Sequence, residues 1–108
     1  MLTKEIHQKA LNAAHTATVK MLEDNPESWF PCGFAWVKAR VKGNTALGKS
    51  FKACGFSKSY NGGYQLWNPS GHGTQWMAAK AAGARAYADV VCEALGDDSI
   101  VIAEERMD

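Results

Sequence analysis

The segment 33–42 combines aromatic and basic side chains at the two-residue spacing of a β-strand. Successive side chains of a strand point to opposite faces of the sheet, so this segment divides into an apolar face and a face of rings and cations. The apolar set is Ala35, Val37, Ala39 and Val41, and the other set is Phe34, Trp36, Lys38, Arg40 and Lys42. Rings that stack on bases, beside cations that neutralise phosphates, suit single-stranded nucleic acid. The segment therefore indicates a strand that binds an anionic partner.

The same segment has a purely structural alternative. Phe34 and Trp36 would pack beneath the first helix, and the cations would only keep the far end of the strand in water. The exposure of these two rings decides between the two interpretations.

Charge is sorted along the chain, although the formal net charge is only +1. No acidic residue lies between Glu27 and Asp89, and this stretch carries a charge of +8, whereas residues 89–108 carry −6. Phosphate affinity grows with the number of cations that a protein presents, so the stretch favours an anionic partner. It does not distinguish RNA, DNA, a nucleotide or an acidic protein. The residues expected at a nucleic-acid interface are Trp36, Lys38, Arg40 and Lys42, with Lys49, Lys52 and Lys58 as electrostatic support.

A glycine-rich loop before a long predicted helix is a second candidate, for binding an anion. Its residues are Ser70, Gly71, His72, Gly73 and Thr74. Glycines let backbone N–H groups approach an anion, and the N-terminus of a helix favours negative charge. The spacing matches neither the Walker-type phosphate loop nor the dinucleotide fingerprint. A turn with a helix cap from Ser70 or Thr74 is the structural alternative.

Four aromatic residues around the central glycines form a third candidate, for docking on another protein. They are Tyr60, Tyr64, Trp67 and Trp76. Aromatic side chains beside a turn often anchor a partner, and several of them exposed together would form an apolar patch. Core packing is the alternative for at least two of them.

Cysteine and histidine give no positive sign of catalysis or metal binding. The three cysteines, Cys32, Cys54 and Cys92, are odd in number and include no CxxC pair, so a disulfide scaffold is not expected. His7 and His15 lie two turns apart on a predicted helix, too far for one metal. We therefore predict a non-enzymatic protein with no catalytic residue, no metal and no cofactor.

The length of 108 residues predicts one compact domain spanning residues 1–108. The N-terminal segment lacks the pattern of an export signal, and no run approaches the roughly 20 apolar residues of a membrane span. We therefore expect a cytoplasmic protein without a membrane partner. The sequence does not indicate its oligomeric state.

The hydrophobic periodicity predicts an α+β fold. Helices are expected over residues 3–24, 45–54 and 74–95, and strands over 33–42, 63–67 and 99–104. Thr3 is a candidate helix cap, the Asn25-Pro26 step ends the first helix, and Tyr60-Asn61-Gly62-Gly63 predicts a turn. Whether residues 56–60 pair with 63–67 as a hairpin is left open. The expected architecture is a small mixed or antiparallel sheet of about three strands, packed against two long helices and one short helix.

The segment 62–71, Gly-Gly-Tyr-Gln-Leu-Trp-Asn-Pro-Ser-Gly, resembles a group of small uncharacterised phage and prophage proteins. The pattern continues through Thr74-Gln75, Met77, Lys80, Gly83-Ala84 and Ala86, and the upstream segment 29–37 belongs to it, so that the resemblance covers about residues 29–91. It implies a small accessory protein made inside an infected bacterium, and it assigns no role to any residue. Nucleic-acid binding, sequestration of a nucleotide and inhibition of a host protein are common roles in that setting.

The leading functional hypothesis is a binding protein whose basic and aromatic strand face contacts nucleic acid. The alternatives are an inhibitor or adaptor that docks on a host protein through an aromatic patch, and a protein that sequesters a nucleotide through residues 70–74.

Overall fold

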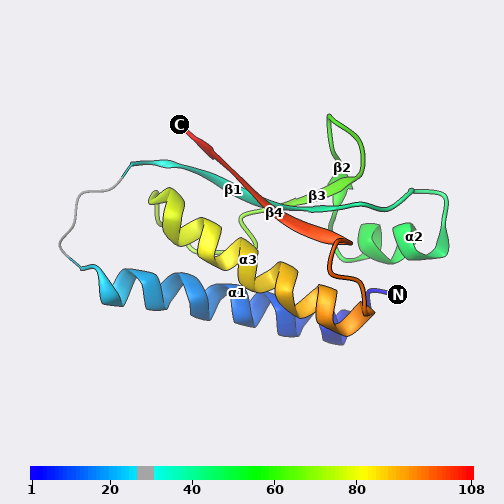
Figure 1. The fold of residues 1–108 in the computed structure, drawn as a ribbon, viewed down its shortest axis with the longest axis horizontal. Coiled ribbons are helices and arrows are strands. Elements are labelled where there is room, and N and C mark those ends of the chain that lie inside the picture. Colours follow the sequence, from blue (N-terminus) through cyan, green and yellow to red (C-terminus); the bar gives the residue numbers. More distant parts are fainter. Residues whose placement is uncertain (27–30) are drawn as a thin grey trace.

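The protein is described by a computed structural model that covers residues 1–26 and 31–108. The two long helices lie on one side of an antiparallel sheet, and the short helix lies at its end (Figure 1). The helices are α1 (Lys4–Asp24), α2 (Ala46–Ala53) and α3 (Met77–Leu95), and the strands are β1 (Gly33–Ala39), β2 (Ser57–Lys58), β3 (Tyr64–Trp67) and β4 (Val101–Met107). The predicted α+β class and the two long helices with one short helix are confirmed.

The sheet has the strand order β2-β3-β1-β4, with every neighbouring pair antiparallel. The sequence predicted about three strands, and β2 is the additional one. Ser57 pairs with Gln65 and Lys58 with Tyr64, so the hairpin that the sequence left open is present. Its turn needs glycine at residue 63, which has a φ of +71° and lies so close to β1 that a Cβ would stand 2.6 Å from the Ala39 carbonyl oxygen.

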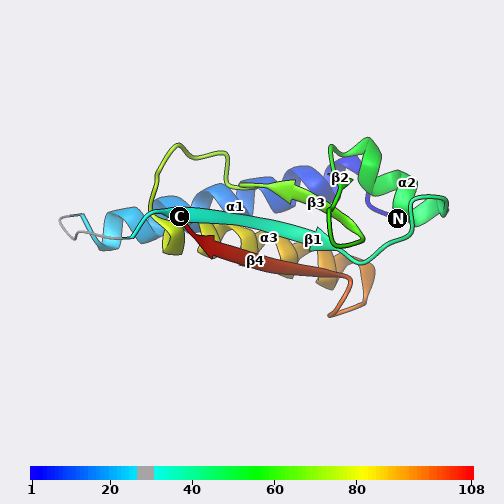
Figure 2. The same cartoon turned by 90° about the horizontal axis from the view of Figure 1, so that it is seen from above.

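The two long helices form layers on one side of the sheet. Helix α3 packs directly against β1 and β4, and α1 packs along α3, as Figures 1 and 2 show from two directions. Small residues permit this close approach, because a Cβ at Gly83 of α3 would lie 2.5 Å from Oγ1 of Thr18 of α1. The buried Thr18 hydroxyl donates a hydrogen bond of 2.7 Å to the Ala79 carbonyl oxygen. This hydrogen bond holds the two alanine-rich helices, α1 and α3, in a defined position relative to each other.

The core lies between the sheet and α3, and it takes the apolar face that the sequence assigned to β1. Ala35, Val37 and Ala39 are fully buried, and Val41 just beyond the strand is buried as well. Alternation along β1 is complete, because every second residue from Gly33 to Ala39 is buried and those between are half-buried. The predicted division of this strand into two faces is confirmed.

Helix and strand boundaries differ from the prediction in three places. Helix α3 begins at Met77 rather than near Thr74, since residues 70–74 are held in local turns. Strand β1 ends at Ala39, three residues before the predicted end, and β4 spans Val101–Met107 instead of 99–104. Strand β4 lies at the edge of the sheet and pairs with β1 as far as Met107. Polar residues fit in it, because every second side chain of such a strand faces water.

Threonine side chains cap the starts of α1 and α2, and the cap predicted at Thr3 is confirmed. Thr3 accepts a hydrogen bond from the Ile6 N–H at the start of α1, and Thr45 accepts one from the Gly48 N–H at the start of α2. Within residues 1–26 and 31–108, no helix is long and apolar enough to cross a membrane.

Candidate nucleic-acid interface

The described helices leave one face of the sheet uncovered, and β1 presents Phe34, Trp36 and Lys38 there. We call this the open face. It is the face opposite to Ala35, Val37 and Ala39, which pack toward α3. The structural alternative, in which Phe34 and Trp36 lie beneath the first helix, is therefore wrong: α1 packs on α3, on the other side of the sheet (Figure 1).

Strand pairing arranges the open face in rows across the sheet. The central row runs from Trp67 of β3 through Trp36 of β1 to Glu104 of β4. The next row runs from Gln65 through Lys38 to Ile102, and the row on the other side joins Phe34 to Arg106. Residues from distant parts of the sequence thus meet on one surface.

Three rings form the centre of this surface, and we call Phe34, Trp36 and Trp67 the aromatic platform. The Trp36 and Trp67 ring centroids lie 4.8 Å apart with an interplanar angle of 42°. Phe34 meets Trp67 edge to face, with centroids 6.1 Å apart. Trp67 is 47% exposed, so a large part of its ring surface faces water, which is unusual for so large an aromatic side chain. The platform offers stacking surface to a planar group.

Cations border the platform on several sides. The Lys80 ammonium lies 5.5 Å and the Arg106 guanidinium 5.6 Å from the Phe34 ring centroid. Lys80 also donates a hydrogen bond of 3.0 Å to the Gly33 carbonyl oxygen. Lys38 is on the open face, whereas Arg40 lies just beyond the end of β1, exposed, with its N–H bonded to the Ile100 carbonyl oxygen. The charge distribution along the chain does not point to Arg106, because Arg106 lies in the acidic C-terminal stretch.

Glu104 of that C-terminal stretch lies on the open face, and Asp97 lies in the turn before β4. Glu104 accepts a hydrogen bond of 2.9 Å from Nε1 of Trp36, which orients the indole. At the end of the ladder, hydrogen bonds from Ser99 lower the pKa of the Asp97 carboxyl, and the nearby Arg40 lowers that pKa further. The C-terminal acids are therefore partly structural and are not only a solvated tail.

A hollow of about 330 Å³ opens beside the platform, between it and the β2–β3 turn. It is lined by strand residues and by the β2–β3 turn: Trp36, Lys38, Gln65, Trp67, Glu104, Arg106 and residues 59–61. This size is at the lower end of the range for small-molecule sites, roughly 300–1,000 Å³. The hollow brings aromatic, cationic and acidic groups together in one place.

The other predicted cations lie away from this centre. Lys42 follows the end of β1 and is exposed, while Lys49 and Lys52 are exposed on α2. The Lys52 ammonium lies 5.6 Å from the Tyr64 ring centroid, and Lys58 pairs with Tyr64. Because Tyr64 alternates with Gln65 and pairs with Ala39, it belongs to the opposite side of the sheet from the platform. These lysines can act on the open face only at longer range.

The predicted anion-binding loop folds into turns that use its own backbone donors. The His72 N–H donates to Ser70 Oγ, the Thr74 N–H to His72 Nδ1, and the Gly71 N–H to the Asn68 carbonyl oxygen. Gly71 and Gly73 have open space around them. Helix α3 starts three residues beyond Thr74, and neither Ser70 nor Thr74 makes a cap hydrogen bond to it. The cap expected from these residues is wrong, and the geometry of 70–74 gives the nucleotide alternative little support.

Of the four aromatic residues that suggested a docking site, Tyr60 and Trp67 line the same hollow, whereas the other two lie elsewhere. Tyr60 is fully exposed at the hairpin tip, and Trp67 lies on the open face. Tyr64 is half-buried on the opposite side of the sheet, and Trp76 is half-buried where it bridges to Cys32 ahead of α3. Trp29 and Phe30, which belong to the resemblance segment, lie outside the described residues.

The cysteines and histidines are spread over the fold. Cys92 is buried, Cys54 is half-buried and Cys32 is exposed, and burial raises the pKa of the Cys54 thiol, which disfavours a reactive thiolate. Among residues 1–26 and 31–108, no three His, Cys, Asp or Glu side chains come together as a metal site. His15 and His72 approach one another with ring centroids 6.0 Å apart, and His15 Nδ1 is 3.0 Å from the Ser70 carbonyl oxygen.

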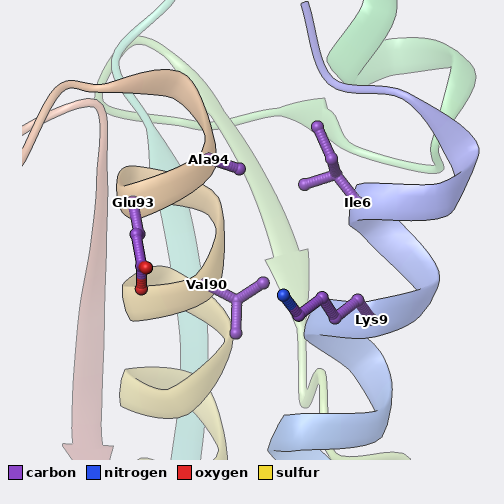
Figure 3. Close-up of a pocket in the computed structure, with 5 residues that line it drawn as sticks. All are labelled: Ile6, Lys9, Val90, Glu93 and Ala94. Carbon is purple, nitrogen blue, oxygen red and sulfur yellow. The ribbon is translucent and has the colours of Figure 1, made fainter.

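A second hollow, of about 290 Å³, lies between the start of α1 and the end of α3 (Figure 3). Ile6, Val90 and Ala94 make it mainly apolar, and Lys9 extends from α1 toward α3. Lys9 and Glu93 are its only charged lining residues among those described. Such a groove has few polar groups to orient a ligand, so the open face is the better candidate.

No family model matches the chain, and comparisons with the curated proteins and with the solved structures found no match.

Proposed function

We propose that the protein binds single-stranded nucleic acid through the open face and that it does so without catalysing a reaction. The observation that carries the proposal is the pair Trp36 and Trp67, which lie side by side on an uncovered sheet face between cations. Base stacking on such rings contributes about 1–3 kcal/mol per base and tolerates any sequence.

Electrostatics supports the same partner. Lys38, Arg106 and Lys80 lie at the platform, and Glu104 is the acidic residue in its central row. The open face therefore carries a positive balance, although the whole chain is near neutral. Cations around stacked rings suit a strand whose phosphates follow the edge of the surface while its bases turn inward.

A second candidate function is docking on a host protein, and Tyr60 is the observation that favours it. This side chain is fully exposed at the tip of the β2–β3 turn, near the hollow and the exposed Trp67. Exposed aromatic residues are frequent anchors of protein interfaces. Apolar burial would then supply the affinity, and the complex would survive both nuclease treatment and high salt.

The setting that we propose is the cytoplasm of a phage-infected bacterium, which follows from the resemblance to phage and prophage proteins. Single-stranded nucleic acid is abundant during phage replication, and a small basic surface would protect it or compete for it.

The test is equilibrium binding of a fluorescent oligothymidylate, measured by anisotropy at low salt. Lys38→Ala with Arg40→Ala removes one cation of the open face and one just beyond the end of β1, and it should weaken binding at least several-fold. Lys9→Ala with Lys20→Ala is the matched control, because it removes the same charge from α1 on the far side of the sheet (Figure 1). Equal losses in the two double variants, or no binding by the native protein, would contradict the proposal.

A further inference from the structure

We infer that the hollow beside the platform recognises a guanine base of the bound strand, with Glu104 as the residue that selects it. The inference rests on the proposed function and adds a base preference to it. Glu104 places a carboxylate, which repels phosphate, in the middle of a surface otherwise suited to phosphate.

Glu104 has unused hydrogen-bonding capacity in a fixed position. Its Oε1 accepts from the Trp36 indole at 2.9 Å, and it lines the hollow directly across β1 from Trp67. An ionised carboxylate offers about four lone-pair sites, so the indole leaves most of them for a ligand. The indole also holds the carboxylate in place, which reduces the entropy lost when a ligand binds.

The chemistry of the bases then favours guanine. Its Watson–Crick edge carries two adjacent donors, the N1–H and the 2-amino group, which match the two oxygens of a carboxylate. Adenine and cytosine present an amino group next to an acceptor nitrogen, and thymine presents one N–H between two carbonyl oxygens, so each of them sets an acceptor against Glu104. Paired hydrogen bonds to a base edge are a main source of base discrimination.

The remaining walls of the hollow suit the same base. Trp67, with 47% of its surface exposed, provides a ring on which a purine can stack. Lys38 lies two residues from Trp36 on the open face and can donate to the guanine O6. Arg106 also lines the hollow and can donate to a phosphate. The hollow of about 330 Å³ is large enough to hold a base.

The experiment compares oligothymidylates of one length that carry a single central guanine, hypoxanthine, adenine, cytosine or thymine. We expect the guanine strand to bind about tenfold more tightly than the thymine strand, as one bidentate pair predicts. Hypoxanthine lacks the 2-amino group and should lose most of that gain. Guanosine monophosphate should compete poorly, because it brings one phosphate where the strand brings several.

Two variants separate the role of Glu104 from general binding. Glu104→Gln keeps one oxygen that can accept from the Trp36 indole but loses the second acceptor, so the ratio of the guanine-strand to the thymine-strand affinity should fall close to one in this variant. Glu105→Gln is the matched control, since Glu105 pairs with Ala35 and so points to the other side of the sheet. It should keep the preference.

Four outcomes would overturn the inference. Equal binding of all five strands by the native protein, or a guanine preference that survives in Glu104→Gln, would remove it and leave the proposed function standing. A mononucleotide that competes as well as the strand would replace the strand with a free nucleotide. Absence of binding to every strand would contradict the proposed function as well.

Discussion

Two groups of aromatic rings in this protein have similar packing and opposite environments. In the core, Phe51 meets Phe56 edge to face at 5.1 Å, and Phe56 lies 6.0 Å from Tyr87. On the open face, the platform rings are spaced by 4.8 and 6.1 Å. The core rings are 0–4% exposed, whereas Trp67 is 47% exposed.

The difference indicates what each group does. Burying an aromatic side chain stabilises a fold by roughly 25 cal/mol per Å² of apolar surface, and the core rings obtain nearly all of that gain. The platform rings obtain only part of it, because water still reaches them. Their unburied surface is available to a partner, so we assign stability to the core rings and binding to the platform.

The largest expected effect is on stability, from Phe51→Ala. Removing a fully buried phenyl ring leaves a cavity and should lower the free energy of unfolding by about 3–5 kcal/mol. Urea denaturation followed by circular dichroism measures the loss. Trp67→Ala is the comparison variant and should lose about 1 kcal/mol or less, as is usual for partly exposed positions. Similar losses in both variants would remove the distinction between the two groups of rings.

The next effect is on binding, from the same Trp67→Ala variant. Loss of one stacking ring should weaken oligothymidylate binding by about 1–3 kcal/mol, measured as a ratio of dissociation constants by anisotropy. Trp67→Phe keeps an aromatic face and should retain most of the affinity. Unchanged binding by Trp67→Ala would show that the platform does not contact the strand.

The smallest effect concerns pH and lies on the core side. His7 Nδ1 is 2.7 Å from the Tyr87 hydroxyl, and burial lowers the pKa of His7 from 6.5 while it raises the pKa of Tyr87. A lowered histidine pKa means that the unfolded chain binds the proton more readily than the folded protein. The folded protein should therefore lose stability as the pH falls through 6.5 toward the lower folded-state pKa.

His7→Gln tests this linkage, because the variant lacks the titrating group. Urea midpoints at about pH 7.5 and about pH 5.5 should fall more in the native protein than in His7→Gln. Oligothymidylate binding at a fixed pH should be the same in both, since His7 lies in α1 on the far side of the sheet. Parallel decreases in stability would show that other groups dominate the pH dependence.

Local patterns in the sequence predict much of this fold. The alternation of β1 is visible because one face is small and apolar and the other is not, and Thr3 and Thr45 mark helix starts through hydrogen bonds within four residues. The sequence does not predict the hairpin at 57–67, because β2 pairs through only two exposed residues, Ser57 and Lys58, which carry no hydrophobic pattern.

The site depends on contacts that no local pattern encodes. Trp36 and Glu104 are 68 residues apart and meet only because β4 pairs with β1 in one register. Trp67 joins Trp36 through the β1–β3 register, although the sequence grouped it with Tyr60, Tyr64 and Trp76. Charge alone suggests that Lys49, Lys52 and Lys58 belong to the interface. Charge does not indicate on which side of a sheet a residue lies.

The central claim is that cations of the open face contact the phosphates of a single strand, and the salt dependence of binding tests it most directly. For single strands, the logarithm of the binding constant falls against the logarithm of salt concentration with a slope of about −0.7 per neutralised phosphate. Lys38→Ala with Arg40→Ala should therefore make the slope shallower by about 1.4, whereas Lys9→Ala with Lys20→Ala should leave it unchanged. Binding by the native protein that does not respond to salt, or equal slopes in the native protein and the Lys38→Ala, Arg40→Ala variant, would contradict the account.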